Sequence, residues 1–456
     1  MGDIFDLAII GGGTNGYATF LTAVSSGLKV VLLEKDRIGQ KANYASLGMI
    51  QPGLKYLHSD LDLVKMDALD CRLLRTITGD LLQSQSFILP VFSDYRFPLS
   101  KPWFWEIYLN AYDQFSDLAL HPRGHWWLTG EGKKQLQQKF QKPLAEGMVF
   151  EEWVVNPMTL AKVFTFAGKF FGGTVLEQSK VVGFETVEEQ AGRTIKAVRL
   201  LRPSGKIETI QAKYFVNTSG AWIPTIIKIL GISSKLKLRP TRGTSIIVGR
   251  KLTEKGIILF DERKNYLVLL PQPDGTLIGP TNYDIHPRVA ENPDRLWPKK
   301  FEMEELLETV NRYMTLETPL SLKDIVEIKY GLRPQIYDQG PASQISHRFA
   351  IFNHRSEGVL NFTSMCGGKL STLLTMSKEL TELVCHELRH PFEWKIPYLL
   401  LSQDKVEIFE KPVCSPADYA KNYALKTPRQ IKQGKFKSLR KRTRAIFNLL
   451  TYALQK

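Results

Sequence analysis

The stretch Asp6-Leu-Ala-Ile-Ile-Gly-Gly-Gly-Thr-Asn-Gly16 decides the fold. An apolar strand runs into Gly11, Gly13 and Gly16, which form a G-x-G-x-x-G pattern at the start of a helix. The first glycine permits the tight turn, the second lets the backbone approach a pyrophosphate, and the third lets the helix pack on the strand. The helix N-terminus presents free N–H groups to phosphate. This stretch therefore predicts a dinucleotide-binding site.

A second strand and an acidic residue strengthen that prediction. The apolar run from Val30 to Leu33 is followed by Glu34, roughly 20 residues after the glycines, where a carboxylate can accept from a ribose hydroxyl. The alternative is a glycine-rich turn in some other α/β fold. With strand, helix, strand and acid all in order, we favour the dinucleotide-binding interpretation.

Composition is that of a globular protein. The 456 residues suffice for two or three domains, and 43% are hydrophobic. We expect no signal peptide, because Met1-Gly-Asp-Ile leads straight into the first strand, and no apolar run approaches the ~20 residues that span a bilayer. The four cysteines have no paired or metal-like spacing, so we expect reduced thiols, no metal site and a cytoplasmic location.

The net charge of +15 is concentrated at the C-terminus. Residues 421–456 carry eleven Lys or Arg and no acid, and an apolar-rich segment begins at Ala445. This combination is typical of a segment that binds an anionic membrane surface. A solvated tail is a close alternative, and nucleic acid is the least favoured partner.

Three further regions indicate how the chain is organised. The strand and turn from Tyr214 to Trp222 resemble a return to the cofactor sheet, and a glycine turn at 366–372 followed by a helix does so again. Between them, residues 238–285 alternate as β-strands and predict a second, mixed-sheet domain. Asn156 and Pro157 predict the N-cap and first residue of a helix.

In combination these segments resemble the FAD-dependent glycerol-3-phosphate dehydrogenases, within the D-amino-acid-oxidase-like flavoproteins. The resemblance covers roughly residues 4–385. Its nine motifs, in order, are IIGGGTNG (9–16), PGLKYL (52–57), PWFWEIYLNAYD (102–113), EEWVVNPMTL (151–160), VNTSGAW (216–222), RGTSIIV (242–248), IGPTNYD (278–284), GLRP (331–334) and GGKLST (367–372). It implies a bound FAD, a phosphorylated polyol as substrate, and quinone as electron acceptor.

The resemblance also implies a domain division. The fold class is α/β, with a discontinuous Rossmann-type FAD-binding domain, a mixed β-sheet substrate domain and a short helical basic C-terminal extension. We assign residues 1–100, 151–235 and 351–390 to the FAD-binding domain, 101–150 and 236–350 to the substrate domain, and 391–456 to the extension.

Cofactor-binding residues follow from the glycine fingerprint and from the matched motifs. Expected to contact FAD are Gly11, Gly13, Thr14, Asn15, Gly16, Glu34, Lys35, Ser46, Val182, Ser219, Gly220, Gly368, Lys369, Leu370 and Thr372. We lean towards non-covalent FAD, because the loop after Glu34 contains no histidine or cysteine up to Leu57.

The resemblance assigns four residues to the substrate. Arg333 matches a family arginine that binds an anion or polarises a hydroxyl, and Lys369 matches a lysine close to the flavin. Lys55 and Tyr56 match a phosphate-binding arginine and the tyrosine beside it. Each has a structural alternative: a sheet-edge ion pair for Arg333, a surface position for Lys369 and a packed aromatic for Tyr56.

Departures from the family pattern leave the substrate open. Lys55 keeps the charge of an arginine but loses its bidentate fork, and Asn282 replaces an aspartate. Ser245 stands where the family has a histidine that is a candidate base. A second arginine is expected after GLRP, and either His347 or Arg348 can take its place. We predict His347 as a catalytic residue beside Arg333 and Lys369; a polar surface histidine is the alternative.

Three functions remain in competition. The first is oxidation of sn-glycerol 3-phosphate, or a close hydroxy-phosphate, to dihydroxyacetone phosphate at the cytoplasmic face of a membrane. The second is the same fold acting on an amine, an amino acid or another hydroxy acid, with oxygen as a candidate acceptor. The third is a flavoprotein with reduced catalysis whose basic tail binds RNA or protein.

Overall fold

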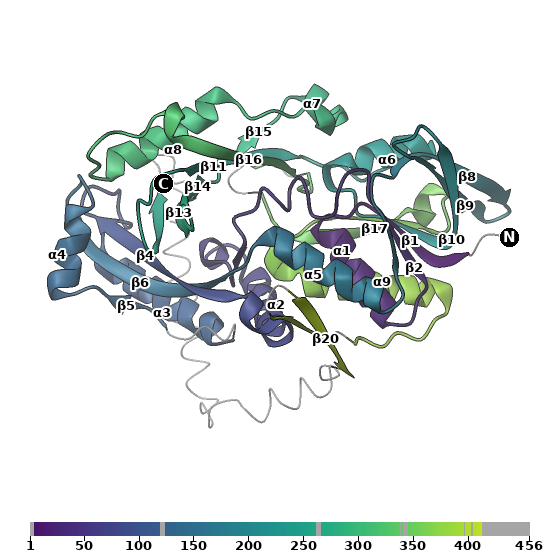
Figure 1. The fold of residues 1–456 in the computed structure, drawn as a ribbon, viewed down its shortest axis with the longest axis horizontal. Helices are drawn as coiled ribbons and strands as arrows, with labels where there is room; N and C mark the ends of the chain where they lie inside the picture. Colours follow the sequence, from purple (N-terminus) through teal and green to yellow (C-terminus); the bar gives the residue numbers. More distant parts are fainter. Residues whose placement is uncertain are drawn as a thin grey trace.

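The computed structural model describes residues 4–118, 124–260, 266–337, 339–340, 345–395, 397–402 and 405–412. They form two lobes, each built on one large β-sheet (Figure 1). The lobe with the N-terminus contains the glycine fingerprint, and the other contains most of the alternating segments at 238–285.

The first sheet has the strand order β17-β18-β10-β1-β2-β7, with β9 paired to β10 and β8 paired to β9. Its strands are β1 (Phe5–Ile10), β2 (Val30–Leu33), β7 (Thr174–Leu176), β8 (Lys180–Glu189), β9 (Gly192–Leu201), β10 (Ile207–Asn217), β17 (Phe349–Asn353) and β18 (Phe362–Gly367). The central pairs are parallel, so the carboxyl ends of β1, β10 and β18 lie at one edge. The glycine turn, the segment after Asn217 and the turn after Gly367 therefore converge there.

Both faces of this sheet are covered, which explains the unbroken apolar run of β1. Leu7 and Ile9 point towards one helical layer, and Ala8 and Ile10 point to the opposite face. The first layer consists of α1 (Thr14–Ser25), α5 (Pro157–Phe170) and α9 (Leu373–Leu388), which lie side by side in Figure 1. The opposite face packs against α6 (Ile223–Leu230) and the β8–β9 hairpin.

The second sheet is mixed, as expected. Strands β12 and β4 are parallel neighbours, and the other neighbouring strands of this sheet are antiparallel. Its order is β15-β11-β14-β13-β12-β4-β6-β3, with β16 on β11 and β5 on β6. Its strands are β3 (Met49–Ile50), β4 (Gln83–Phe92), β5 (Trp126–Trp127), β6 (Leu144–Val154), β11 (Thr241–Val248), β12 (Gly256–Phe260), β13 (Tyr266–Gln272), β14 (Gly275–Gly279), β15 (Tyr283–Asp284) and β16 (Ile325–Arg333).

Helices also cover this sheet on both faces. Phe87 and Leu89 of β4 face α3 (Pro102–Leu118), and Ile88 faces α8 (Lys300–Tyr313). The other helices here are α2 (Leu61–Thr78), α4 (Gly130–Gln138) and α7 (Pro287–Glu291). The short 3-10 helices are η1 (Leu54–Tyr56), η2 (Gly79–Leu81), η3 (Gly220–Trp222), η4 (Pro293–Arg295), η5 (Leu322–Asp324), η7 (His354–Glu357) and η8 (Leu370–Thr372). Helix α2 contacts α3 in one lobe and η8 and α9 in the other, so it joins the lobes.

The predicted N-terminus of helix α5 is confirmed. The side chain of Asn156 accepts hydrogen bonds from the backbone N–H groups of Met158 and Thr159, and Pro157 is the first residue of α5. The expected domain boundaries stay predictions. Strands β3 and β4 lie within residues 1–100 but pair in the second sheet, since the chain crosses between the lobes.

The expected helical extension is only partly described. Residues Pro397–Ser402 (β19) and Lys405–Pro412 (β20) form an antiparallel pair. The basic segment 421–456 and Cys414 lie outside the described residues. The other three cysteines are free and buried. No helix in the described part of the chain is long and apolar enough to cross a membrane.

Candidate active site

The glycine turn has the geometry of a pyrophosphate cradle. Gly11 has a φ of +106°, and a Cβ there would lie 2.6 Å from the Cα of Ser219. A Cβ on Gly16 would lie 1.8 Å from the carbonyl oxygen of Gly11, so the helix packs against the turn only without a side chain. A Cβ on Gly13 would meet no atom within 4 Å, which leaves this backbone open to a ligand. The tight turn at Gly11 and the close packing at Gly16 are as predicted, and the approach of a pyrophosphate to Gly13 stays a prediction.

Glu34 holds this turn in place. Its two carboxylate oxygens accept backbone N–H groups of Gly12 and Asp36, both at 2.7 Å. Burial raises the pKa of Glu34, and these hydrogen bonds oppose the effect. A carboxylate oxygen has a second lone pair, so contact with a ribose hydroxyl remains geometrically open. That contact stays a prediction.

Lys35 sits where the two lobes meet beside the turn. Its Nζ forms ion pairs with Asp36 at 2.9 Å and with Asp294 at 2.6 Å, and it lies 4.6 Å from the centre of the Trp222 ring. Asp294 belongs to η4, which follows α7 of the second lobe. The second lobe therefore closes over the first at this end.

A cavity of about 630 Å³ extends from the glycine turn to the second sheet. Among the predicted residues, those that line it are Gly11, Gly13, Thr14, Asn15, Glu34, Lys35, Ser46, Ser219, Gly220, Arg333, His347, Gly368, Lys369 and Leu370. Residues from β1, β11, β16 and the turn after β18 thus face one space, although they lie hundreds of positions apart.

Five predicted residues do not line this cavity directly. Gly16 packs behind the turn, and Val181 takes the position expected for Val182. Thr372 is fully buried, and its hydroxyl bonds with the backbone N–H and carbonyl of Lys369. It shapes the turn that carries Lys369. The other two, Lys55 and Tyr56, do not line the cavity but adjoin residues that do: the charges of Lys55 and Arg333 interact, and the Tyr56 ring contacts that of His347.

Arg333 is held at the end of β16 by neutral groups. Its guanidinium donates to the side-chain oxygen of Asn282 at 3.1 Å and to the carbonyl of Thr281 at 3.0 Å. Gly243 on the neighbouring strand has no side chain, and a Cβ there would lie 2.2 Å from the guanidinium. Because Asn282 replaces the aspartate of the family pattern, no carboxylate in the described part of the chain forms an ion pair with Arg333.

Lys55 is a second cation without a carboxylate partner among the described residues. Its Nζ lies 4.9 Å from the centre of the Tyr56 ring. Burial, together with the positive charges of Arg333 and Lys369, lowers the pKa of Lys55 to about 7. Lys55 therefore belongs to the same electrostatic cluster as Arg333 and Lys369, and its expected role in phosphate binding stays a prediction.

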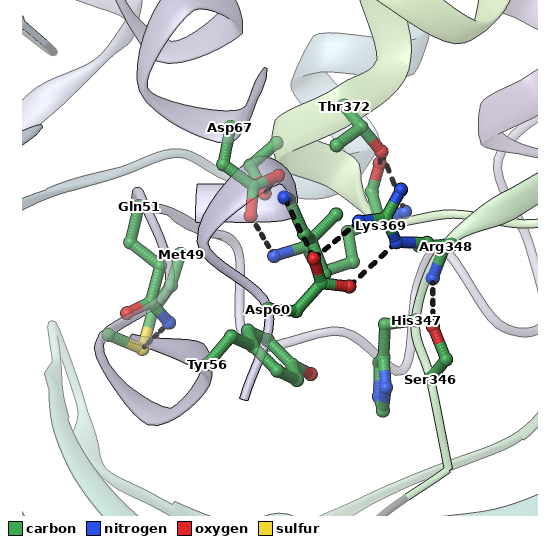
Figure 2. Close-up of polar contacts among 12 residues, drawn as sticks. Met49, Gln51, Tyr56, Asp60, Asp67, Ser346, His347, Arg348, Lys369 and Thr372 are labelled. Carbon is green, nitrogen blue, oxygen red and sulfur yellow. Dashed lines mark hydrogen bonds and ion pairs between the residues drawn. The ribbon is translucent and has the colours of Figure 1, made fainter. Parts of the chain in front are cut away.

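His347 and Arg348 point in different directions. Figure 2 shows His347 beside Tyr56, with 5.4 Å between the ring centres. The guanidinium of Arg348 instead forms an ion pair with Asp60, with Nε–Oδ2 at 2.7 Å. His347 lines the cavity, whereas Arg348 does not line it and is held by its ion pair with Asp60.

The hydrogen bonds of His347 define its protonation. Its Nδ1 lies 3.0 Å from the carbonyl oxygen of Ile345, which can only accept, and 3.5 Å from the side-chain nitrogen of Gln335; the shorter contact favours the tautomer with the proton on Nδ1 and the lone pair on Nε2. Burial and the charges of Lys55, Arg333 and Lys369 lower the pKa of His347 well below its ordinary value. The imidazole is therefore neutral at physiological pH.

The sequence predictions assign no role to two residues near the site, Ser245 and Asp67. Ser245 is buried, its hydroxyl has no hydrogen-bond partner in the described structure, and it does not line the cavity. Asp67 of α2 was not predicted at all, yet it accepts from Lys369 and lies above Tyr56 in Figure 2. A carboxylate on the apolar face of a helix, between Val64 and Cys71, was the signal for it.

The chain has distant relatives among known proteins. Among curated relatives, the chain is 26% identical to a glycerol-3-phosphate dehydrogenase of Synechocystis sp., over 84% of this chain and 70% of the relative. It is 25% identical to a D-erythritol 1-phosphate dehydrogenase of Brucella abortus, over 85% of this chain and 74% of the relative. Both are distant relatives, so their substrates do not transfer without further argument.

A solved structure shares the fold. The glycerol-3-phosphate dehydrogenase of Bacillus halodurans, complexed with FAD, superposes with a TM-score of 0.65 at 18% identity, over 86% of this chain and 66% of that one. The family model described as FAD dependent oxidoreductase matches residues 6–383. The chain therefore belongs to this family of FAD-dependent oxidoreductases, and FAD is its cofactor.

Proposed function

We propose that this protein oxidises sn-glycerol 3-phosphate, or a close polyol phosphate, to the corresponding keto phosphate and passes the electrons to quinone. The observation that carries the proposal is the charge of the substrate end of the cavity. Lys55 and Arg333 converge there, and neither has a carboxylate partner in the described structure. Two uncompensated cations match the dianion of a phosphate monoester.

His347 supplies the second requirement of the reaction. Oxidation of a carbinol removes a hydride from carbon and a proton from oxygen. Bound FAD supplies the hydride acceptor. The lone pair on Nε2 of the neutral imidazole is suited to accept the hydroxyl proton, because Nδ1–H is already held by the Ile345 carbonyl. His347 can therefore replace the base that is absent at Ser245.

The names of the relatives support the same substrate class. The two curated relatives are named as dehydrogenases of glycerol 3-phosphate and of erythritol 1-phosphate, and both substrates join a polyol to one phosphate. The length of the polyol is not determined by the contacts at the substrate end, and the experiment must compare both.

The alternative is an oxidase or dehydrogenase of an amine, an amino acid or another hydroxy acid. It is favoured by two departures, the lysine at position 55 and the serine at position 245. A carboxylate substrate has one negative charge and needs one guanidinium fork, which Arg333 alone can provide. Hydrogen peroxide released from a panel of amino acids would support this alternative.

The electron acceptor and location are proposed from the family resemblance and the basic segment. Residues 421–456 carry eleven cations, which favours an anionic membrane surface where quinone is dissolved. The full chain should sediment with vesicles that contain anionic lipid and stay in the supernatant with neutral vesicles. Equal sedimentation with both would contradict the electrostatic docking.

The test of the proposed function is an anaerobic absorbance spectrum of the FAD-loaded protein. The band of oxidised flavin near about 450 nm should disappear on addition of sn-glycerol 3-phosphate or erythritol 1-phosphate, because hydride transfer reduces the flavin. Amino acids should leave it unchanged. An oxidised band at saturating concentrations of both phosphates would contradict the proposal, and bleaching by an amino acid would establish the alternative.

A further inference from the structure

The third cation of the site, Lys369, differs from the other two because it has a buried counter-ion. Its Nζ donates to Oδ2 of Asp67, and Ser371 donates to Oδ1 of the same carboxylate at 3.1 Å. The Asp67 side chain is fully buried, and that of Lys369 is 14% exposed. The pair lies directly above the Tyr56 ring, 4.4 Å from Nζ to the ring centre (Figure 2).

The backbone is shaped to admit this pair. Gly53 has a φ of +96°, and a Cβ there would lie 2.8 Å from the Tyr56 ring and 3.3 Å from both Lys369 Nζ and Asp67 Oδ2. The absence of a side chain lets the loop before η1 close over the ion pair. The lysine is therefore enclosed from three sides, by α2, by Tyr56 and by the loop.

A second carboxylate of α2 provides a natural comparison. Asp70 lies one helical turn after Asp67 and accepts backbone N–H groups of Leu374 at 3.0 Å and Thr375 at 2.9 Å, at the start of α9. It stabilises the helix that follows the turn and makes no hydrogen bond with Lys369. The two acids thus hold neighbouring parts of one segment, but only Asp67 contacts the cavity cation.

The charge of Asp67 is costly to bury and is retained by its partners. Burial raises its pKa to about 6, and the charge and hydrogen bond of Lys369 act in the opposite direction. At pH 7 the carboxylate is mostly ionised and cancels the charge of Lys369. The substrate end then has two groups without a carboxylate partner, Arg333 and a Lys55 that is about half protonated, and one compensated cation, Lys369; a bound dianion would favour the charged form of Lys55.

We propose that Asp67 is a positioning residue that holds the Lys369 ammonium against Tyr56 and cancels its charge, so that the cavity is matched to a single dianion. This inference rests on the proposed function. Without Asp67, the ammonium would be free to move and would add one positive charge to the site. The expected signature is unusual, because removal of a buried acid should strengthen the binding of an anion while impairing its orientation.

The test uses sulfate as the probe, because sulfate stays a dianion across the working pH range and cannot be oxidised. Its dissociation constant is measured from the perturbation of the flavin spectrum in the FAD-loaded protein, at constant ionic strength and pH 7.5. The charge gained in Asp67→Asn should tighten sulfate binding about tenfold. It should also shift the flavin midpoint potential to a more positive value, because added positive charge favours the reduced flavin.

The matched variants separate this role from a purely structural one. Asp70→Asn should change thermal stability but leave sulfate binding and the potential as in the unaltered protein. Lys369→Gln should weaken sulfate binding, since it leaves Asp67 unpaired. The double variant Asp67→Asn with Lys369→Gln, which removes the pair together, should bind sulfate within about twofold of the unaltered protein.

Two outcomes would overturn the inference. One is an unchanged sulfate affinity and potential in Asp67→Asn. The other, which stays decisive if Asp67→Asn does not fold, is a double variant that binds sulfate as weakly as Lys369→Gln. Neither outcome depends on which substrate is oxidised, so a failure of the proposed function would leave this test intact.

Discussion

The two ends of the cavity are built by different means. The cofactor end is formed mainly by the backbone: Gly11, Gly13 and Gly16 shape the turn, and Glu34 accepts backbone N–H groups. At the substrate end, side chains from distant segments provide the chemistry, and their charges are only partly compensated. A site formed by backbone atoms tolerates almost no substitution. The substrate specificity of a site formed by side chains can change through single substitutions.

The first prediction tests the backbone end and has the largest expected effect. Gly16→Ala should yield a protein without FAD and with a lower melting temperature, because the new Cβ would lie 1.8 Å from the carbonyl oxygen of Gly11. Gly13→Ala should keep the melting temperature but weaken FAD binding about a hundredfold, because its Cβ would enter only the space needed by the pyrophosphate. Flavin fluorescence after dialysis and calorimetry distinguish the two. Similar stability in both variants would contradict the assigned roles.

The second prediction concerns Arg333. Arg333→Met should reduce kcat/KM for sn-glycerol 3-phosphate about a thousandfold while FAD stays bound, because a buried cation without a carboxylate partner is removed from the substrate end. The matched control is Arg348→Met, which breaks a half-exposed ion pair with Asp60. It should change kcat/KM less than about threefold. Comparable losses of kcat/KM in both variants would contradict the assignment of Arg333, rather than Arg348, to the substrate end of the cavity.

The third prediction separates proton transfer from binding. His347→Gln should lower kcat about a hundredfold and leave sulfate affinity nearly unchanged, because a neutral imidazole contributes a lone pair and no charge. The lowered pKa also implies that His347 stays neutral from pH 8 to pH 6, so it should cause no loss of kcat across that interval. A protonation-dependent loss of kcat that disappears in His347→Gln would disprove the neutral-base role.

The fourth prediction is the smallest and is specific to Lys55. Its pKa of about 7 means that the ammonium is charged below pH 7 and loses its charge as the pH rises. Sulfate affinity should therefore fall about fivefold between pH 7 and pH 9, an interval in which Asp67 stays ionised. Lys55→Arg should remove this dependence, because a guanidinium stays protonated. An identical pH profile in both proteins would show that another group titrates.

The same contrast explains what the sequence can predict. The cofactor end follows from a local sequence pattern, so the segment from Gly11 to Glu34 predicted the turn, helix, strand and acid correctly. At the substrate end, the family motifs predicted Lys55, Arg333 and Lys369 as site residues, but the charge balance of these side chains depends on partners far away in the chain. Asp67 is separated from Lys369 by 302 positions, so no local spacing could pair them. The choice between His347 and Arg348 likewise required the ion pair with Asp60.

The central claim is that the substrate end recognises a phosphate dianion, and rapid mixing tests it most directly. The rate of anaerobic flavin reduction is compared for sn-glycerol 3-phosphate and for glycerol, which has the same reacting carbon but no phosphate. We predict a second-order rate constant at least about a thousandfold larger for the phosphate ester, because only it engages Lys55 and Arg333. Equal rate constants for the two compounds would contradict the account.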